Sequence, residues 1–332
     1  MREPAFWWRK PGLTAGMLAP LGSVYGTIAA RRMSVKGTQA EVPVICVGNF
    51  TLGGAGKTPT VMMLAGMFAG AGHHPFCLSR GYRGNVVGPK LVDAHKDVAA
   101  QVGDEALLIA QVASVVVARD RVAGAAFARA QGADLVIMDD GLQNPSLKKD
   151  FTLAVVDARR GVGNSYIFPA GPLRASLAAQ IAQTDGLLVV GDDAYADSVT
   201  EQCRARALPV FHGRLVPDPG TPALLKGRRV LAFAGIGDPE KFFATAVKAG
   251  IAVTQRHAFD DHHRYTAEEA AELIMQAEHS GLALLTTEKD HARMAGDPLL
   301  EVLASRAHKL AVTMLVEEAD ELRRLVTLKL RR

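Results

Sequence analysis

The stretch VPVICVGNFTLGGAGKTP, residues 42–59, decides the fold of this chain. Its apolar beginning, residues 42–47, predicts a buried strand, and the glycines after it predict a tight turn into a helix. Glycine has no side chain, so successive backbone N–H groups of such a turn can converge on phosphate oxygens. We therefore expect a nucleotide-binding loop that consists of Thr51, Leu52, Gly53, Gly54, Ala55, Gly56, Lys57 and Thr58.

The last residues of this loop carry the polar groups that ATP chemistry needs. Lys57 is expected to reach the β- and γ-phosphates, and the Thr58 hydroxyl is expected to help hold Mg²⁺. The usual motif has glycine at the position of Thr51, so this loop is a GGxGKT variant in which Gly53 and Gly54 form the turn. The alternative is a glycine-rich turn that binds no nucleotide.

The composition is that of a globular protein with room for two domains. Of the 332 residues, 48% are hydrophobic and 22% are charged, which excludes a disordered chain. The three cysteines, Cys46, Cys77 and Cys203, are far apart, which argues against a disulfide framework or a zinc site. The formal charge of +4 is too small an excess to indicate nucleic acid, and we expect no nucleic-acid partner.

Apolar runs that alternate with helical patterns predict an α/β fold. The runs are continuous in Val, Ile and Leu, which is typical of strands covered on both faces. We therefore expect a mostly parallel, P-loop NTPase-like sheet with helices on both faces. A PDPGTP segment at residues 217–222 predicts a boundary. It divides the chain into an N-terminal region (1–36), a P-loop domain (37–216) and a smaller C-terminal α/β domain (217–332).

The periodicity also gives individual elements. The predicted strands of the P-loop domain cover residues 42–47, 74–79, 115–118, 135–138, 153–156 and 187–190, and its helices cover 57–71, 104–113 and 120–131. In the smaller domain we predict strands at 230–234, 251–256, 282–286 and 310–316, helices at 239–249 and 266–280, and a closing helix.

The N-terminal region has the features of a segment that lies on a membrane. Trp7 and Trp8 stand beside Arg9 and Lys10 at the head of a charge-free run, residues 11–30. Indoles and basic residues at headgroup level favour an amphipathic helix at the membrane surface. A membrane-spanning helix and an ordinary core helix are the alternatives. Five large apolar residues recur at helical spacing along one side of this run: Leu13, Met17, Leu21, Val24 and Ile28.

Two acids suited to Mg²⁺ follow the predicted strand at residues 135–138. They are Asp139 and Asp140. The carboxyl ends of parallel strands lie at the same edge of a sheet as the phosphate loop, so either carboxylate can face the metal directly or through water. An acidic turn that merely ends a strand is the alternative.

Six short motifs follow one another along the chain. They are GNFTLGGAGKTPT (48–60), SRGYRG (79–84), VGDEA (102–106), DDGLQN (139–144), FPAGPLR (168–174) and TTEKD (286–290). In this order, and over essentially the whole chain, they resemble the tetraacyldisaccharide 4′-kinase (lipid A 4′-kinase) family of Gram-negative bacteria.

The resemblance implies a lipid kinase that uses ATP and Mg²⁺. Such an enzyme transfers the γ-phosphoryl group to the 4′-hydroxyl of an acylated glucosamine disaccharide 1-phosphate lipid, tetraacyldisaccharide 1-phosphate. The implied product is lipid IVA, an intermediate of lipid A and lipopolysaccharide biosynthesis. The implied location is the cytoplasmic face of the bacterial inner membrane, as a peripheral or monotopic protein, which agrees with the membrane-surface interpretation of the N-terminal region.

The resemblance also implies a catalytic pair. Asp104 matches an acid that activates the attacking hydroxyl, because an alcohol must lose its proton during transfer. His262 matches a histidine that works with this acid, and the adjacent His263 is an alternative. The smaller domain carries both histidines, so it would close over the active-site cleft to complete the site. Without the family pattern, a helix N-cap with no chemical role is the alternative for Asp104, and a surface turn is the favoured interpretation of the two histidines.

The loop and strand-end residues keep their roles under the resemblance. Lys57 and Asp139 are expected to be catalytic, and the implied metal ligands are Thr58, Asp139 and Asp140. The chain departs from the family pattern at Ala175 and Asn144, where family members often carry glutamate and histidine. We expect activity to survive these changes, with local differences in how nucleotide or metal is held.

Arginines in loops near strand ends or helix starts are candidates to bind a phosphate of the substrate, since a guanidinium fork suits phosphate oxygens. Surface ion pairs are the alternative for each of them. The substrate-binding candidates are Arg80, Arg83, Arg119, Arg121 and Arg174, together with Gln143.

The strongest competing interpretation is a membrane-associated switch ATPase of the partitioning type, which also uses a GGxGKT loop and an amphipathic helix. Its hallmark is a lysine directly before the two glycines, where this chain has Leu52. A non-catalytic nucleotide-binding module is a third interpretation, but the intact Lys57, Thr58, Asp104 and Asp139 argue against it.

Overall fold

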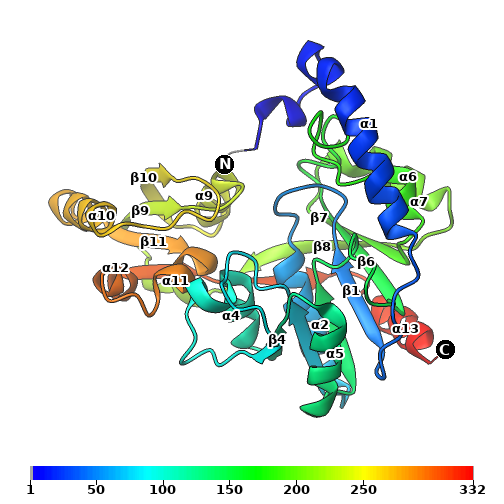
Figure 1. Ribbon diagram of the computed structural model, residues 1–332. Coiled ribbons are helices and arrows are strands. Elements are labelled where there is room, and N and C mark those ends of the chain that lie inside the picture. Colours follow the sequence, from blue (N-terminus) through cyan, green and yellow to red (C-terminus); the bar gives the residue numbers. More distant parts are fainter. Residues whose placement is uncertain (1–2, 332) are drawn as a thin grey trace.

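The computed structural model describes residues 3–331, which form a large and a small lobe around two sheets (Figure 1). The large sheet contains β1 (Val44–Gly48), β2 (Pro75–Ser79), β3 (Lys90–Leu91), β4 (Ser114–Val117), β5 (Leu135–Asp139), β6 (Phe151–Asp157), β7 (Gly186–Val190), β8 (Val210–Pro217) and β13 (Val312–Val316). The small sheet contains β9 (Arg229–Ala234), β10 (Ala252–Ala258), β11 (Ala283–Thr287) and β12 (Ala307–Leu310).

The longer helices connect these strands. They are α1 (Leu13–Met33), α2 (Lys57–Gly70), α4 (Asp104–Ala110), α5 (Arg121–Ala130), α7 (Asp197–Arg204), α9 (Pro239–Lys248), α10 (Ala267–Ser280), α11 (Glu288–Met294) and α13 (Ala319–Leu330). Shorter helical segments are η1 (Ala5–Trp8), α3 (Ala99–Val102), α6 (Leu177–Ile181), η2 (Ala194–Ala196), α8 (Gly220–Leu224) and α12 (Glu301–Arg306).

Strand β1 lies in the middle of the large sheet, whose order is β13-β8-β7-β6-β1-β5-β2-β4-β3. It runs parallel to both neighbours, β5 and β6. The two edge strands, β3 and β13, are antiparallel to the strands beside them. Helices α2, α4 and α13 cover one face of the sheet, and α5, α6 and α7 cover the other. The predicted mostly parallel α/β fold is confirmed.

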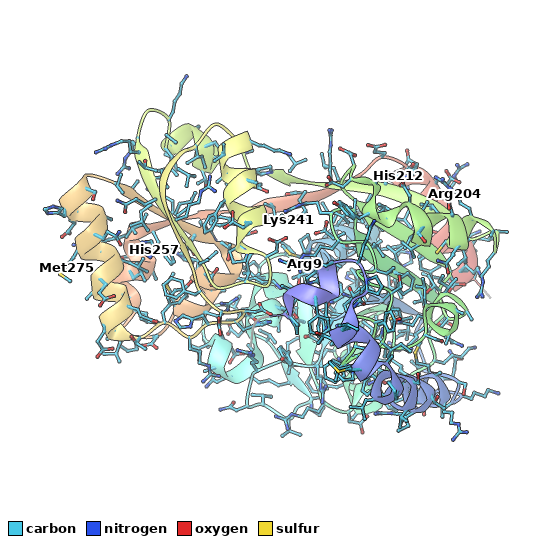
Figure 2. All side chains as sticks on the ribbon, turned by 90° about the horizontal axis from the view of Figure 1, so that it is seen from above. Arg9, Arg204, His212, Lys241, His257 and Met275 are labelled. Carbon is cyan, nitrogen blue, oxygen red and sulfur yellow. The ribbon has the colours of Figure 1, made fainter. Side chains whose placement is uncertain are left out.

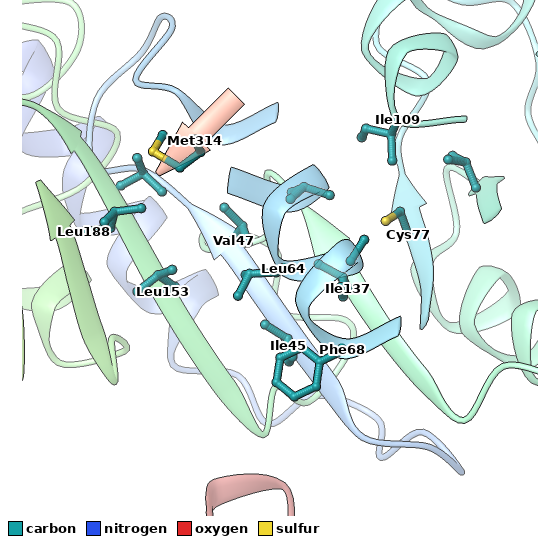
Figure 3. Close-up of a cluster of buried hydrophobic side chains, with 14 of the residues drawn as sticks. Ile45, Val47, Leu64, Phe68, Cys77, Ile109, Ile137, Leu153, Leu188 and Met314 are labelled. Atoms are coloured by element: carbon teal, nitrogen blue, oxygen red, sulfur yellow. The ribbon is translucent and has the colours of Figure 1, made fainter. Parts of the chain in front are cut away.

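Buried side chains fix the strand and the helix on either side of the phosphate loop. Successive side chains of a strand point to opposite faces, so Ile45 and Val47 of β1 pack with Leu64 and Phe68 of α2 (Figure 3), whereas Val44 packs on the α5 side. All five side chains are buried. Burial of each such side chain stabilises the fold by about 1.5–3 kcal/mol, which holds the loop between two rigid elements.

The end of the chain returns to the large sheet, which differs from the expected second domain at residues 217–332. Of the strand predicted at 310–316, residues 312–316 form β13, which pairs with β8, whereas Leu310 is the last residue of β12 in the small sheet. Met314 of β13 and Leu322 and Val326 of α13 are buried in the core of the large lobe. These apolar side chains would be exposed if the segment stayed with the small lobe, which explains its return.

Helix α1 lies on the outside of the large lobe (Figure 1), and its buried residues are Ala15, Gly22, Gly26 and Met33. A Cβ atom at Gly22 would lie 2.7 Å from the carbonyl oxygen of Ile167, so the two backbones are in close contact there. By length and composition, α1 is the helix among residues 3–331 that could cross a membrane. The five large apolar side chains singled out in the sequence are exposed: Leu13 88%, Met17 74%, Leu21 60%, Val24 62% and Ile28 56%.

The Gly22→Ala substitution is expected to loosen this helix. The added methyl group would press on backbone rather than on a flexible side chain, which typically costs about 1–3 kcal/mol. Gly16→Ala is the matched control, since nothing lies within 4 Å of its Cβ position and alanine favours a helix over glycine by about 1 kcal/mol. Urea unfolding of both variants measures the difference, and equal free energies of unfolding would contradict the close packing at Gly22.

Candidate active site

The phosphate loop follows β1 at the carboxyl edge of the large sheet. Gly53 and Gly56 have φ angles of +96° and +94°, a region that strongly favours glycine because a side chain clashes with the backbone there. Lys57 Nζ lies 3.5 Å from the carbonyl oxygen of Gly53 and 3.6 Å from Asp140 Oδ1. The lysine is therefore folded over the loop, where phosphate loops hold the β- and γ-phosphates of a nucleotide.

Asp139, the last residue of β5, has a carboxylate oxygen without a partner. The residue is 2% exposed, and its Oδ1 is buried and makes no hydrogen bond among the described residues. Burial, and then the negative charges of Glu105 and Asp140, raise the pKa of Asp139 to about 7. A buried, unpaired carboxylate is costly, so this oxygen fits a cation ligand. Mg²⁺ suits the site, since it needs one or two carboxylates together with substrate phosphates.

Asp140 occupies the neighbouring position and is held by Arg174. Its φ angle is +50°. Arg174 Nη1 donates to Asp140 Oδ1 and Oδ2 at 3.0 and 3.1 Å, and Arg174 Nη2 donates to Oδ2 at 3.1 Å. Burial raises the pKa of Asp140, but the positive charges of Lys57 and Arg174 outweigh burial and lower the pKa to about 2. Asp140 is therefore an anion that connects the loop lysine to Arg174.

Asp104 meets His262 where the two lobes touch. Asp104 begins α4 of the large lobe, and its Oδ2 lies 3.2 Å from His262 Nδ1 and 2.8 Å from Arg293 Nε of the small lobe. Burial raises the pKa of Asp104, but the hydrogen bond with His262 and the charges of Lys289 and Arg293 outweigh it, so the pKa lies well below its usual range. Asp290, which is fully buried, accepts a hydrogen bond from Arg293 Nη1 and steadies it.

The two adjacent histidines have different surroundings. His262 has a φ angle of +55° and packs edge-on against Tyr82 of the large lobe. His263 points elsewhere: its Nε2 lies 2.8 Å from Glu269 Oε2, and its ring stacks on Phe259 at a centroid distance of 4.8 Å. The structure therefore brings His262, rather than the alternative His263, to Asp104. Backbone strain of the kind seen at His262 is concentrated at functional sites.

Glu105 and Lys289 join the site, although the motifs VGDEA and TTEKD had suggested no role for them. Glu105 Oε1 accepts hydrogen bonds from Lys289 Nζ at 2.6 Å and from the Thr58 hydroxyl at 3.5 Å. Burial raises the pKa of Glu105, but the charges of Lys289 and Lys57 and the hydrogen bond from Lys289 together outweigh burial and lower the pKa. Glu105 therefore connects Lys289 of the small lobe to Thr58 of the phosphate loop.

The proposed substrate-binding residues fall into two groups. Arg80, Arg83 and Arg119 are exposed, and Arg83 Nη1 donates to the carbonyl oxygen of His262 at 2.9 Å. Arg121 is only 3% exposed and donates to the carbonyl oxygen of Ala118, so it cannot reach an external lipid phosphate in this arrangement. Exposed and buried arginines look alike in a sequence, and only packing separates them.

Gln143 and Arg174 are also engaged within the protein. Gln143 Nε2 donates to the carbonyl oxygen of Asn49 and to Gln180 Oε1, both at 2.8 Å. Arg174 donates to Gln143 Oε1 at 3.2 Å as well as to Asp140. Their contacts favour support of the phosphate loop over direct contact with the lipid.

Asn144 and Ala175, the two positions that depart from the family pattern, both interact with the protein around them. Asn144 Oδ1 accepts hydrogen bonds from the Ser146 backbone N–H at 2.9 Å and from its hydroxyl at 2.6 Å. The Ala175 side chain is fully buried. Asn144 therefore closes the turn after the paired acids.

Glu3 reaches the phosphate loop from the N-terminal segment. A Cβ atom at Gly53 would lie 2.0 Å from Glu3 Oε1. Arg160 Nη1 donates to Glu3 Oε2 at 2.6 Å, and its guanidinium lies over the Trp8 ring at 4.6 Å. Burial is the main cause of the raised pKa of Glu3. No periodicity or motif marked Glu3, because its neighbours are remote in sequence.

Comparison with known proteins gives a consistent result. Residues 14–331 match the LpxK family, described as tetraacyldisaccharide-1-P 4′-kinase. A tetraacyldisaccharide 4′-kinase of Rhodopseudomonas palustris (strain BisB5) is 54% identical over 324 residues, which are 98% of this chain and 95% of that protein. One from Nitrobacter winogradskyi is 50% identical, over 97% of this chain and 96% of that protein. The crystal structure of LpxK from Aquifex aeolicus in complex with ATP superposes with a TM-score of 0.73 at 25% identity, over 96% of this chain and 100% of that chain.

Proposed function

This chain belongs to the tetraacyldisaccharide-1-phosphate 4′-kinase family, and we propose that it transfers the γ-phosphoryl group of ATP to the 4′-hydroxyl of tetraacyldisaccharide 1-phosphate. The product is then lipid IVA of lipid A biosynthesis. The contact of Asp104 with His262 beside the phosphate loop carries this proposal, since such a pair could accept the proton of a hydroxyl group bound there. The partitioning-type ATPase is not favoured by the relatives.

Asp104 would accept or orient the proton of the attacking hydroxyl. Its low pKa makes it a weak base, and a loose phosphoryl-transfer transition state demands little from a base. His262 would hold the carboxylate in place from the small lobe. Closure of the small lobe over the cleft would then assemble the pair and exclude water, which limits hydrolysis of ATP.

The phosphate loop would hold the nucleotide. Lys57 would contact the β- and γ-phosphates, and residues 51–58 would surround them with backbone N–H groups. Thr58 and Asp139 are the residues that would hold Mg²⁺, with Asp140 beside them. When bound, this ion would supply positive charge that offsets the charge of the phosphates.

The acceptor lipid would be presented at the membrane surface, on the cytoplasmic side where ATP is available. Exposed leucine, methionine, valine and isoleucine side chains of α1 give this helix an apolar side, and Arg31 and Arg32 at its end suit anionic headgroups. Arg80, Arg83 and Arg119 remain the candidates for the lipid phosphate, because they are exposed, and Arg83 also contacts His262 of the small lobe.

Transfer of label from γ-³²P-ATP to tetraacyldisaccharide 1-phosphate in detergent micelles with Mg²⁺ tests the proposed function. The native chain is expected to produce one labelled lipid that carries phosphate at the 4′ position. Membrane-stimulated ATP hydrolysis without a labelled lipid would instead support a switch ATPase.

Replacing Leu13, Met17 and Leu21 together with glutamine is expected to weaken membrane binding. Each large apolar side chain contributes about 1.5–3 kcal/mol when buried in an apolar phase, so binding to anionic phospholipid vesicles should fall by at least about tenfold per side chain fully inserted. ATP binding should not change, because these three side chains are exposed and none of the described contacts links them to the phosphate loop. Vesicle sedimentation measures the binding.

A matched control replaces three exposed apolar residues of the small lobe with glutamine. They are Val247 (47% exposed), Met275 (60%, labelled in Figure 2) and Leu299 (72%). This variant should bind vesicles like the native chain. Equal loss in both triple variants would show that general surface hydrophobicity, not α1, mediates binding.

A further inference from the structure

The two lobes bring opposite charges to the site where they meet. The large lobe contributes three carboxylates close to the phosphate loop, Asp104, Glu105 and Asp139. The small lobe contributes Lys289 and Arg293, one turn apart on α11. Arg293 is committed to Asp104 and Asp290 and its side chain is 8% exposed. Among the described residues, Lys289 forms an ion pair with one carboxylate, that of Glu105, and the proposed function assigns it no role.

A single carboxylate oxygen, Glu105 Oε1, bridges Lys289 and the phosphate loop. Lys289 Nζ is 2.6 Å from Glu105 Oε1, and the same oxygen accepts the Thr58 hydroxyl at 3.5 Å. The Lys289 side chain remains 28% exposed. A flexible stem with three donors on a point charge can exchange one anionic partner for another.

The ammonium group is charged. Burial lowers the pKa of Lys289, but the carboxylates of Glu105 and Asp104 outweigh burial and hold the pKa above its usual value. Glu105 thus keeps a positive charge from the small lobe poised beside Thr58. In phosphoryl transfer, positive charge close to the γ-phosphate stabilises the transition state, and a cation supplied from a separate element is a recurrent source of it.

We propose that Lys289 is a catalytic residue, which contacts the transferring γ-phosphoryl group of ATP from the small lobe and offsets its negative charge. This inference rests on the proposed kinase function and assigns the TTEKD motif a chemical role. Because Lys289 belongs to the small lobe, closure of the lobes would itself bring the positive charge to the γ-phosphate. ATP bound to an open site would lack this charge, which limits hydrolysis by water.

Lys289 forms and breaks no covalent bond in the phosphoryl transfer. The acceptor 4′-oxygen forms a bond to the γ-phosphorus, and the bond between this phosphorus and the β,γ-bridging oxygen breaks. The bridging oxygen keeps the electron pair and leaves as part of ADP. The hydroxyl proton passes to the Asp104 and His262 pair. Lys289 gives up no proton and changes only the electrostatic energy of the phosphoryl group.

The test compares Lys289→Gln with Lys241→Gln. Lys241 of α9 (labelled in Figure 2) also bridges the lobes, since its Nζ donates a hydrogen bond to Asp157 Oδ2 at the end of β6, and none of its described contacts involves Asp104 or Thr58. For each variant, calorimetry measures the affinity for MgADP with and without aluminium fluoride, a mimic of the transferring phosphoryl group that needs no lipid. Lipid labelling gives kcat and the KM for ATP.

Lys289→Gln is expected to bind MgADP like the native chain but to lose most of the tightening caused by aluminium fluoride. Its kcat should fall by about 10²- to 10³-fold, as for other lost transition-state donors, with little change in the KM for ATP. Lys241→Gln should keep both the tightening caused by aluminium fluoride and the native kcat. Native tightening or native kcat in Lys289→Gln would overturn the proposal, and so would equal losses in both variants, which would indicate a lobe-bridging role.

A second variant covers the case in which Lys289→Gln does not fold. Lys289→Arg keeps the charge and the pairing with Glu105, so it should tighten on aluminium fluoride to within about tenfold of the native chain. A folded arginine variant that does not tighten would overturn the proposal. If the native chain tightens on aluminium fluoride but makes no labelled lipid, the proposed lipid kinase function fails while the role of Lys289 toward the phosphate is retained.

Discussion

The Lys57→Ala variant is expected to make no detectable labelled lipid from γ-³²P-ATP. Lys57 Nζ lies over the phosphate loop, 3.5 Å from the carbonyl oxygen of Gly53, and in the proposed role it would supply positive charge to the β- and γ-phosphates. Loss of a charged group from a preorganised, water-poor site typically lowers kcat by about 10²- to 10³-fold or more. Because the same lysine binds the ground state of ATP, its affinity for MgATP should also fall.

The control for this variant is Lys329→Ala. Lys329 forms an ion pair with Asp185 at 2.8 Å, and its side chain is 34% exposed, so it is a partly buried lysine of the same lobe outside the phosphate loop. Its removal should leave kcat and ATP affinity within about twofold of the native values, because a partly exposed ion pair contributes about 1 kcal/mol or less. Native turnover in Lys57→Ala would reject the assignment of the loop.

The Asp104→Asn variant is expected to bind MgATP normally and to transfer phosphate poorly. Amide and carboxylate have the same shape, but the amide cannot take the hydroxyl proton, and loss of a general base lowers kcat by about 10²- to 10⁴-fold. Arg293 keeps Asp290 as a partner, so the variant should still fold. Single-turnover labelling and calorimetry with MgATP separate the two effects.

The low pKa of Asp104 also predicts how kcat/KM and the stability of the folded chain depend on pH. The pKa of Asp104 lies well below its usual range in the folded chain, so Asp104 stays ionised from neutral pH down into the acid range. It should therefore cause no inflection in kcat/KM between pH 6 and 9. A depressed pKa also stabilises the folded state above the unfolded pKa of about 4, and this stability is lost as the pH falls toward the folded pKa. The native chain should lose more stability on acidification than Asp104→Asn.

Asp157→Asn is the matched control for Asp104→Asn. Asp157 is also a buried acid of the large lobe that pairs with a cation of the small lobe, in this case Lys241. If both variants lose the same kcat, contact between the lobes, rather than proton acceptance at Asp104, explains the effect.

Much of the large lobe could be predicted from local sequence. Continuous apolar runs marked β1, β2, β5, β6 and β7 to within about two residues, because strands buried on both faces have no polar alternation. The prediction was less complete where the chain changes lobes. Nothing local in residues 310–316 indicates that Leu310 ends a strand of the small sheet and Val312 begins a strand of the large one, since the choice of sheet depends on the cores that receive the two strands.

The sequence by itself determined the phosphate loop, because its strand, glycine turn and helix are all set by neighbouring residues, and its motifs indicated the kinase family. Only the tertiary structure decided which residues complete the site. Asp104 and His262 are 158 positions apart, and Glu105 and Lys289 are 184 apart. Their contacts depend on how the small lobe docks on the large one. Docking is the sum of many weak, long-range contacts, and no short stretch of sequence encodes that sum.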